Sequence, residues 1–333
     1  MVCPNPFERA EIHHSGEVYT CCPTFINEYS IGNVFKTPFA SIWNGEKAYN
    51  LRKKLLENDY SLCSDTCNRK NYFLMNKTSD YDSCQIPYPH SVSISCDTSC
   101  NIRCIFCRDT FIHNNFSQQE VEREVNDIWL PVLKGVKILE LGVNSEPLSN
   151  LKETFLLKRA AEVYPDIRFQ IHTNGILGTE KRLKELGIYN RMENITVSLH
   201  SATEKTHSRV VPVYGGGKTF RRILDNIKTY SKMREKGLLK RLALVFVVFS
   251  ENYQDIPKFV KLAADNNAQA VFWGLRKVSV GGNKTFMSHY DDYDILNPNH
   301  KDHNKLLEVL KNPILKDSVH VDMFPEIKNL IKE

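Results

Sequence analysis

Short apolar segments alternate with longer amphipathic segments through the middle of this chain. The apolar segments, rich in Val, Ile, Leu and Phe, lie at 91–96, 137–142, 167–172, 195–199, 241–249 and 269–273. Helix-like segments separate them at 117–134, 150–163, 179–187, 218–235 and 254–266. Short, nearly continuous apolar runs are typical of parallel strands that are buried on both faces. Their alternation with helices predicts an α/β fold with six parallel strands over residues 85–274.

Six strands are too few for a closed eight-stranded barrel, so we expect an open partial (β/α)6 barrel. In parallel α/β folds, ligands bind at the carboxyl ends of the strands. Functional motifs should therefore follow the strands directly. Residues 275–333 contain two further predicted helices, near 302–311 and 324–332, and we expect this extension to cap the open barrel.

Residues 1–84 are predicted to form a small module ahead of the barrel. The segment Ala10–Thr20 predicts a β-hairpin that turns at Ser15–Gly16. An apolar pair at 42–43 and a helix-like stretch that ends at Leu56 supply apolar side chains to pack against it.

The composition describes a globular protein, since 41% of the 333 residues are hydrophobic. The longest apolar run, Leu242–Phe249, is too short to span a bilayer as a helix. The amino terminus shows neither the basic nor the apolar region of a signal peptide, so we expect a cytoplasmic protein with no membrane partner. The net charge of +5 is modest, and basic spots such as Arg52–Lys54 fit a solvated helix face. We therefore do not expect a nucleic acid partner.

Ten cysteines in a chain without an export signal indicate metal or redox chemistry. Cys100, Cys104 and Cys107 follow the predicted strand at 91–96 with the spacing Cys-x3-Cys-x2-Cys. Three thiolates on one loop can bind three irons of a [4Fe–4S] cluster and leave the fourth iron open, whereas ordinary ferredoxin-like clusters take four cysteines. A zinc knuckle is the alternative, but it usually needs a second ligand pair, and no cysteine follows Cys107.

This loop resembles the signature of the radical SAM superfamily, in which an aromatic residue, here Phe106, precedes the last cysteine. The resemblance implies that S-adenosylmethionine (SAM) chelates the open iron of the cluster. It also implies that one electron cleaves SAM to methionine and a 5′-deoxyadenosyl radical, which abstracts a substrate hydrogen atom. A partial (β/α)6 barrel is the fold that the family implies.

Three further motifs follow predicted strands in the order that the family shows. The turn from Gly142 to Pro147 matches a Gly-Gly-Glu-Pro-like turn that holds the amino group of SAM, although residues 143–145 depart from the glycine-rich form. A Thr-Asn-Gly turn follows the third strand, and a Ser-Leu-His sequence ends the fourth. His200 replaces a common Asp, either as a substrate contact or as a satisfied polar residue. The resemblance implies these cofactor-binding residues: Phe106, Gly142, Ser145, Glu146, Thr173, Asn174, Ser198 and Arg209.

The amino-terminal module has six cysteines of its own. The predicted hairpin can bring Cys3 near Cys21, and Cys63 and Cys67 are spaced to lie on one face of a helical turn. These four thiols could complete a metal site, with Cys22 as an alternative to Cys21 and a structural zinc ion as an alternative to an iron–sulfur cluster.

This module resembles the SPASM/twitch auxiliary-cluster domains of radical SAM enzymes. The matching features are Cys3-x12-Gly16-x4-Cys21, Ile31–Val34, Ile42–Asn44, Leu51–Arg52 and Cys63-x3-Cys67. The resemblance implies a second, auxiliary [4Fe–4S] cluster on Cys3, Cys21, Cys63 and Cys67, although such domains usually follow the barrel. Cys84 and Cys96 are left over. They are either small buried residues or hydrogen-atom donors to a substrate radical.

The resemblance thus implies a radical SAM enzyme of the oxidoreductase or epimerase type. We expect it to modify a peptide or protein by oxidation, crosslinking or epimerisation, with a reduced flavodoxin or ferredoxin as electron donor. The alternatives are a dehydrogenase or epimerase of a sugar or aminocyclitol, an RNA-modifying radical enzyme, and a non-catalytic iron–sulfur or zinc protein that binds RNA or a partner.

Overall fold

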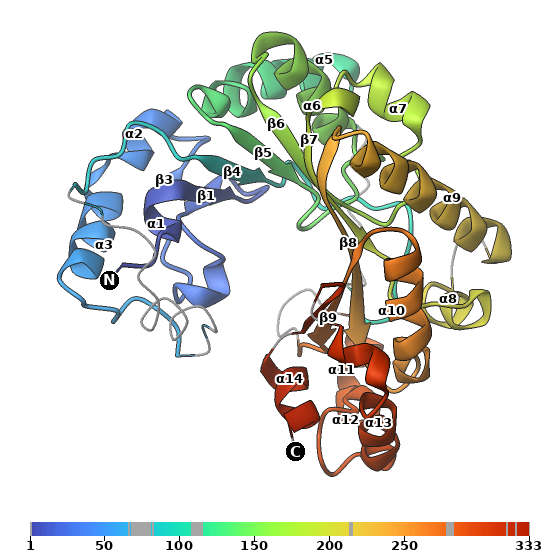
Figure 1. Cartoon of the computed structure of the whole chain (residues 1–333). Coiled ribbons are helices and arrows are strands. Elements are labelled where there is room, and N and C mark those ends of the chain that lie inside the picture. The colour runs from blue at the N-terminus through green and yellow to red at the C-terminus, as the bar shows by residue number, and fades with distance from the viewer. Residues whose placement is uncertain are drawn as a thin grey trace.

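A computed structural model describes residues 2–65, 67, 81, 83–107, 116–212, 216–277, 283–317, 319–323 and 325–332. Its strands form one mixed sheet in the order β10-β9-β8-β7-β6-β5-β4-β1-β2-β3 (Figure 1). The central strands are β4 (Ser91–Ile94), β5 (Ile138–Leu141), β6 (Arg168–Thr173), β7 (Met192–Ser198), β8 (Leu239–Val248) and β9 (Gln269–Gly274). Each of these strands pairs in parallel with the next, which confirms the predicted α/β partial barrel.

Helices cover the convex side of this curved sheet, and its concave side faces the middle of the molecule (Figure 1). The covering helices are α5 (Gln118–Glu124), α6 (Leu151–Val163), α7 (Glu180–Glu185), α8 (Glu204–Val210), α9 (Gly216–Glu235) and α10 (Ile256–Asp265). Burial alternates along β6, where Phe169 and Ile171 belong to the main core while Gln170 and His172 are only half-buried. The apolar side chains of β6 therefore pack beneath the helices, and its polar side chains line the concave face.

The predicted helix at 117–134 is wrong in its second half. Helix α5 ends at Glu124, a wide π-turn spans Val125–Trp129, and a 3-10 turn spans Pro131–Leu133. Pro131 has no backbone N–H and its ring clashes with the carbonyl four residues earlier, so an α-helix cannot continue through it. Trp129 in the π-turn is fully buried and donates its indole N–H to Glu124 at 2.8 Å.

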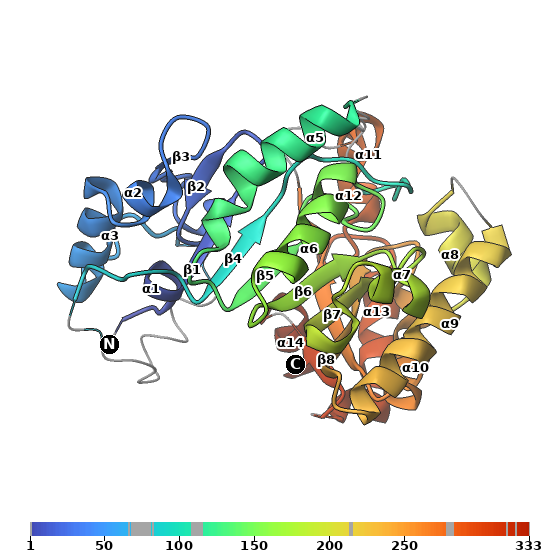
Figure 2. The same ribbon diagram turned by 90° about the horizontal axis from the view of Figure 1, so that it is seen from above.

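The predicted amino-terminal hairpin is confirmed, and it joins the central sheet. Strands β1 (Arg9–Ile12) and β2 (Glu17–Tyr19) are antiparallel, and Gly16 at the turn has φ +83°. Strand β1 pairs in parallel with β4, while β3 (Gly32–Asn33) pairs with β2 at the sheet edge. Helices α1 (Asn5–Glu8), α2 (Phe39–Trp43) and α3 (Glu46–Leu56) pack beside these strands, at the end of the sheet opposite α8 and α9 (Figure 2).

The carboxyl-terminal segment adds a strand that the sequence did not indicate. Its predicted helices are α13 (His303–Leu310) and α14 (Pro325–Lys332), and two short helices precede them, α11 (Lys284–Ser288) and α12 (Tyr290–Tyr293). Strand β10 (Val321–Met323) pairs in parallel with β9. One sheet thus runs across both predicted domain boundaries, at 84/85 and 274/275. Within the described ranges, no helix is long and apolar enough to cross a membrane.

Candidate active site

The cysteine loop follows β4 at the carboxyl end of the sheet. Cys100, Cys104 and Cys107 are each half-buried, and all ten cysteines of the chain lie in the described part without forming a disulfide. Burial, together with the neighbouring Cys107 and Cys100 thiols, raises the pKa of the Cys104 thiol well above its usual range. The Cys104 thiol is thus within electrostatic range of the other two thiols of the loop.

Two backbone hydrogen bonds fix this loop. The N–H of Cys107 donates to the carbonyl of Cys104 at 3.1 Å, and the N–H of Ile105 donates to the carbonyl of Val210 at 3.0 Å. The ring of Phe106 between them packs edge-on against His200 and Phe249, with ring centroids 5.1 and 5.5 Å apart. Because both sides of the aromatic position are fixed, the spacing of the last two thiols is set by the fold.

Glu146 joins the loops that follow β5 and β6. Its side chain is buried and accepts hydrogen bonds from the Thr173 hydroxyl at 2.8 Å and from the backbone N–H of Asn174 at 2.6 Å. A weaker bond comes from the N–H of Leu148 at 3.3 Å. Burial raises the pKa of Glu146 to about 7, against the effect of these hydrogen bonds. The two predicted motif turns are therefore parts of one hydrogen-bonded unit.

Asn174 connects this unit to the cysteine loop. Its side-chain amide donates to the Asn101 side-chain oxygen at 2.7 Å and approaches the Cys100 sulfur at 3.9 Å. The following Gly175 has φ +81°, and its backbone N–H donates to the Thr173 hydroxyl at 3.0 Å. The Thr-Asn-Gly turn thus lies directly beside a predicted cluster ligand.

Gly142 allows the β5 loop to approach β6. It has φ +89°, and a Cβ atom built there would lie 2.0 Å from the carbonyl oxygen of His172. Both the left-handed backbone and the missing space exclude a side chain at this position. The predicted glycine turn is therefore demanded by packing between neighbouring strands.

Glu153 is a buried site residue that sequence reasoning missed. Its side chain accepts a hydrogen bond from the backbone N–H of Cys96 at 3.1 Å and from the Ser145 hydroxyl at 2.6 Å. Burial raises its pKa to about 8. The sequence offered only the pattern of a helix start, and Asn150 does cap α6 by accepting from the N–H of Glu153. The hydroxyl of Ser145, a predicted SAM contact, is thus hydrogen-bonded to Glu153.

His200 is a satisfied polar residue, which favours the second interpretation given above. It is buried in a left-handed conformation with φ +57°, and its Nδ1 accepts a hydrogen bond from the N–H of Val247 at 3.2 Å. Burial, with a smaller effect of His207, lowers the pKa of His200 to about 3, so its ring stays neutral.

Ser198 and Arg209 lie on β7 and α8. Ser198 is the half-buried last residue of β7. Arg209 on α8 donates to the carbonyl of Glu251 at 2.9 Å and pairs with that residue's carboxylate at 3.8 Å. Arg209, a predicted cofactor-binding residue, therefore interacts with the loop after β8.

Two known protein families match this chain. The model of the radical SAM superfamily matches residues 94–263, which is just over half of the chain. This chain belongs to the radical SAM superfamily. A second family, the SPASM iron–sulfur cluster-binding domain, matches residues 3–68. A radical SAM [4Fe–4S] cluster, SAM and an auxiliary iron–sulfur cluster are therefore its cofactors.

Curated relatives match only part of this radical SAM enzyme. A probable dual-specificity RNA methyltransferase RlmN of Desulforamulus reducens is 27% identical over 130 residues, which is 38% of this chain and 37% of that protein. The dual-specificity RNA methyltransferase RlmN of Helicobacter hepaticus is 26% identical over 134 residues, covering 37% of this chain and 35% of that protein. The matched segment thus spans little more than a third of these relatives.

Solved structures of radical SAM enzymes are similar at low identity. SuiB of Streptococcus suis, bound to S-adenosylmethionine, is 14% identical with a TM-score of 0.45 and covers 97% of this chain and 71% of its own. A tagged anSMEcpe with bound AdoMet is 17% identical with a TM-score of 0.46, covering 70% of this chain and 63% of its own.

The amino-terminal thiols fit the auxiliary site of a radical SAM enzyme. Burial and the nearby thiols of Cys21, Cys63 and Cys67 raise the pKa of the Cys3 thiol to about 12. The other three predicted ligands are thus within electrostatic range of Cys3. The side-chain amide of Asn5 approaches the Cys21 sulfur at 3.4 Å, whereas the Cys22 sulfur contacts the Thr24 hydroxyl at 3.2 Å.

One detail of this auxiliary site differs from prediction. Cys63 and Cys67 are held by two successive turns, since their N–H groups donate to the carbonyls of Tyr60 and Ser64, and not by one α-helical turn. Among the described side chains, no group of three or more His, Cys, Asp or Glu is placed to hold a single metal ion. In an iron–sulfur cluster each thiolate binds a different iron, so its ligands lie farther apart than those of one ion.

The two remaining cysteines lie in contrasting places. Cys96 is buried in the main core, and burial raises the pKa of its thiol well above the usual range. Cys84 lies in the amino-terminal region, where its carbonyl accepts a hydrogen bond from Arg52 at 3.0 Å. A role for either thiol as a hydrogen-atom donor in this radical SAM enzyme stays a prediction.

Proposed function

We propose that this radical SAM enzyme oxidises a peptide or protein substrate, and that its auxiliary cluster accepts the electron that the substrate radical loses. The observation that carries the proposal is the attachment of both thiol groups to one sheet. Strand β1, which lies between Cys3 and Cys21, pairs with β4, which leads into the Cys100 loop. A fixed geometry between an oxidising and an electron-accepting site suits dehydrogenation.

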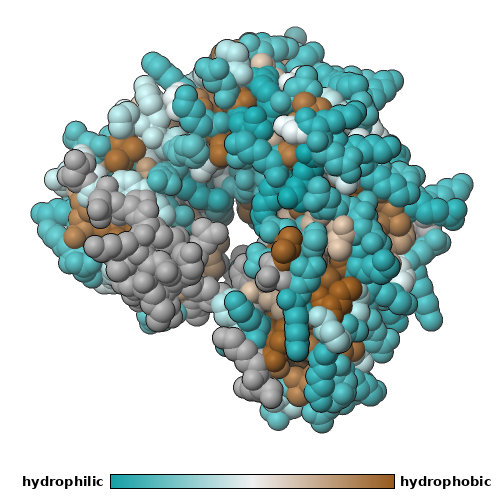
Figure 3. Space-filling view, viewed as in Figure 1, coloured by the Kyte–Doolittle hydropathy of each residue, from teal (hydrophilic) through white to brown (hydrophobic). Residues whose placement is uncertain are grey.

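The strand directions support placing a substrate between the two sites. Cys3 precedes β1, and Cys21 follows the antiparallel β2, so both lie toward the amino ends of β1 and β4. The Cys100 loop follows the carboxyl end of β4. The two thiol groups therefore lie at opposite ends of the paired strands β1 and β4. Figure 3 shows the surface hollowed in the central region of the molecule.

We assign Cys100, Cys104 and Cys107 to the SAM cluster, and Cys3, Cys21, Cys63 and Cys67 to the auxiliary cluster. The bound SAM cluster would supply a radical that removes a substrate hydrogen atom, which is chemistry that side chains alone do not provide. The chain itself holds the loops: Glu146 and Asn174 fix the β5 and β6 turns beside the cysteines. Residues 1–84, 85–274 and 275–333 would act as auxiliary module, barrel and cap.

An RNA methyltransferase is the second candidate function. The matches to RlmN proteins favour it, although they cover only 37–38% of this chain. It predicts a methylated nucleotide as product and needs no two-electron oxidation of the substrate. The net charge of +5 gives it little further support.

One assay separates these candidates. The protein is purified and reconstituted without oxygen, and SAM, a flavodoxin-type reductant and a probe are added. The probes are a random-sequence peptide pool, total ribosomal RNA and an aminocyclitol. Our proposal expects 5′-deoxyadenosine together with peptides two hydrogens lighter by mass spectrometry. Methylated RNA, or an oxidised aminocyclitol with unchanged peptides, would contradict it.

The control for this assay is the triple variant in which Cys100, Cys104 and Cys107 are replaced by Ala. It should form no 5′-deoxyadenosine while retaining the iron of the amino-terminal site. Zinc in place of iron in the wild-type protein, with no labile sulfide, would rule out the radical reaction altogether.

A further inference from the structure

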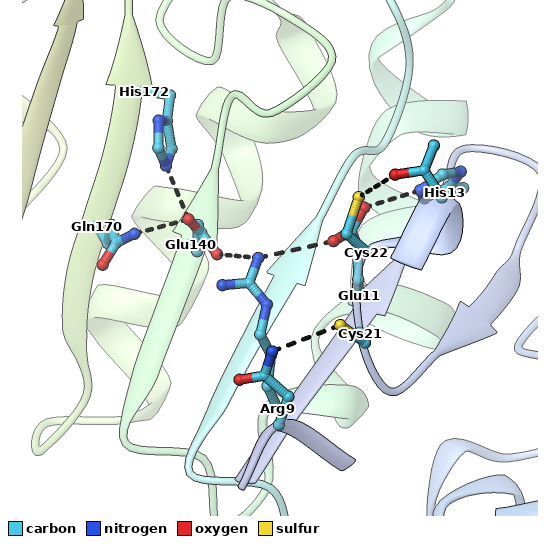
Figure 4. Close-up of polar contacts among 10 residues, drawn as sticks. Arg9, Glu11, His13, Cys21, Cys22, Glu140, Gln170 and His172 are labelled. Atoms are coloured by element: carbon cyan, nitrogen blue, oxygen red, sulfur yellow. Dashed lines mark hydrogen bonds and ion pairs between the residues drawn. The ribbon is translucent and has the colours of Figure 1, made fainter. Parts of the chain in front are cut away.

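The concave face of the sheet holds an ionic network that none of the motifs includes (Figure 4). At its centre, the carboxylate of Glu140 on β5 contacts three polar side chains from two other strands. Arg9 on β1 pairs with it at 2.8 Å, the His172 Nε2 lies 2.7 Å from its Oε1, and Gln170 donates to the same oxygen at 2.6 Å. The same Arg9 lies 3.6 Å from Glu11, which in turn bonds His13 at 3.0 Å.

This network determines the tautomer of His172. Burial opposes ionisation of Glu140, but the hydrogen bond and the charge of His172, the Arg9 guanidinium and the Gln170 amide together lower its pKa to about 2. An ionised carboxylate can only accept hydrogen bonds, so the proton of the imidazole must lie on Nε2. In the uncharged form of a ring that donates from Nε2, Nδ1 is the nitrogen that can accept a hydrogen bond or a proton.

The free side of this imidazole is accessible. The side chain of His172 is 23% exposed, and the described residues give its Nδ1 no hydrogen-bond partner. His172 directly precedes Thr173 and Asn174, and the Asn174 amide reaches the Cys100 sulfur at 3.9 Å. The available nitrogen thus belongs to the strand end next to the cysteine loop.

The surroundings of His172 on the concave face are mixed. Thr196 on β7 is its uncharged register partner, and Ser93 on β4 is the uncharged neighbour of Glu140. The charged groups of the described network are Glu140 from β5 and Arg9 and Glu11 from β1. Beyond β7 the face becomes apolar, with Ala243, Val245, Val271 and Trp273 packed together. A substrate on this face would meet an apolar surface on one side and the imidazole on the other.

We propose that Nδ1 of His172 accepts the proton that the substrate loses during oxidation, with Glu140 and Arg9 as positioning residues. The assignment rests on the proposed function. When bound, SAM and the oxidised auxiliary iron–sulfur cluster would supply removal of a hydrogen atom from a substrate C–H bond and uptake of one electron. The proton of the neighbouring N–H or O–H group would go to Nδ1 of His172. A C=N or C=O double bond forms, and the product is two hydrogens lighter.

The contact between His172 and Glu140 suits the uptake of a proton by His172. A carboxylate bonded to one ring nitrogen fixes the ring and stabilises the imidazolium that forms when the other nitrogen takes a proton. Arg9 pairs with the buried Glu140 at 2.8 Å and offsets its charge.

The first test determines the tautomer of His172 in the absence of substrate. Holoenzyme labelled with ¹⁵N-histidine is measured by NMR from pH 6 to 9, and the His172→Gln variant assigns the signal. We expect the neutral ring to carry its proton on Nε2 at pH 8. A proton on Nδ1, or an imidazolium that persists to pH 9, would overturn the assignment because no acceptor would then be available.

The second test measures what fraction of the substrate radicals goes on to oxidised product. Glutamine at position 172 can still donate to Glu140 but cannot take up a proton. With the peptide pool, His172→Gln should keep 5′-deoxyadenosine formation within about twofold and lower the oxidised product per 5′-deoxyadenosine by roughly 10²-fold or more. Deuterium from labelled peptides should still appear in 5′-deoxyadenosine.

The matched control is His320→Gln, which alters a second histidine–carboxylate pair, His320 with Asp317 at 2.8 Å, outside the concave network. It should leave the amount of oxidised product per 5′-deoxyadenosine unchanged. If His172→Gln also leaves this ratio unchanged, the role of His172 is overturned but the proposed function is not. A wild-type enzyme that forms no lighter peptide would overturn the proposed function, and the assignment with it.

Discussion

Buried carboxyl groups hold the loops of the site together at the scale of single residues. Glu146 links the β5 and β6 turns, and Glu153 links the start of the cysteine loop to Ser145. Burial raises the pKa of both, to about 7 and about 8. Their neutral forms are therefore favoured by folding, and their ionisation opposes it.

The sign of the pH dependence follows from these raised values. Well below the ordinary glutamate pKa of 4.5, both groups are protonated whether the chain is folded or unfolded, and their contribution to stability is fully present. It is lost as the pH rises through about 7 for Glu146 and about 8 for Glu153. Between pH 6 and 8, Glu153 alone should cost roughly 2–3 kcal/mol.

We expect Glu153→Gln to flatten this decline, because the amide keeps both hydrogen bonds without a charge. Thermal unfolding under argon at several pH values measures the effect. Glu162→Gln on the exposed part of the same helix is the control and should keep the wild-type slope. Equal slopes for all three proteins would show that Glu153 is not the titrating group.

A second residue-scale prediction concerns neighbouring cysteines. Cys21→Ala should lower the iron content by about four atoms per chain, since the auxiliary cluster loses a ligand. Cys22→Ala should leave it unchanged, because that sulfur contacts Thr24. Iron analysis after anaerobic reconstitution measures this difference. Iron lost in Cys22→Ala but retained in Cys21→Ala would make Cys22 the ligand.

Arg52 organises the amino-terminal elements at the scale of helices and strands. Its buried guanidinium donates to the carbonyls of Pro6 at 2.8 Å, Trp43 at 2.9 Å and Cys84 at 3.0 Å, and it stacks on the Trp43 ring. One side chain on α3 thus ties α1, α2 and the end of the module together.

Arg52→Leu should destabilise this region by roughly 3 kcal/mol or more, since three buried carbonyls lose their donor. We expect loss of the auxiliary cluster with retention of SAM cleavage, measured as iron content and 5′-deoxyadenosine. Lys53→Ala removes an exposed neighbouring cation and should change neither. Full iron content in Arg52→Leu would contradict the anchoring role.

Glycine at the end of β5 gives another prediction at this scale. Gly142→Ala would place a Cβ 2.0 Å from the His172 carbonyl, whereas at Gly237, also left-handed with φ +70°, no atom lies within 4 Å. Gly237→Ala should cost about 1–2 kcal/mol of backbone strain. Gly142→Ala should cost clearly more and abolish SAM cleavage, and equal melting temperatures would contradict this.

Shared sheet pairing unites the predicted domains at the scale of the whole molecule. Strand β1 covers the edge of β4, and β10 covers the edge of β9. Removing residues 1–84 would expose the backbone of β4 to pairing with other chains. We expect the truncated protein to aggregate, as measured by size-exclusion chromatography. A monomer that still binds its SAM cluster would show that the module is an independent domain.

Much of the fold was predictable because its signals are local. The six central strands were found within a few residues, since buried parallel strands have continuous apolar runs. Strand β10 was missed because three residues carry too little pattern, and the helix over 117–134 was overextended because the break at Pro131 was ignored. Among the site residues, Glu153 was missed because it lies in the first turn of α6, which Asn150 caps.

The sequence by itself determined the cysteine spacing, the order of the motifs behind the strands and the alternation of strands with helices, because each depends on neighbouring residues. Only the tertiary structure decided that β1 pairs with β4 and that Arg9, Glu140 and His172 meet on one face. Those contacts join distant parts of the chain, and their formation depends on which strands pack side by side. No local pattern encodes that choice.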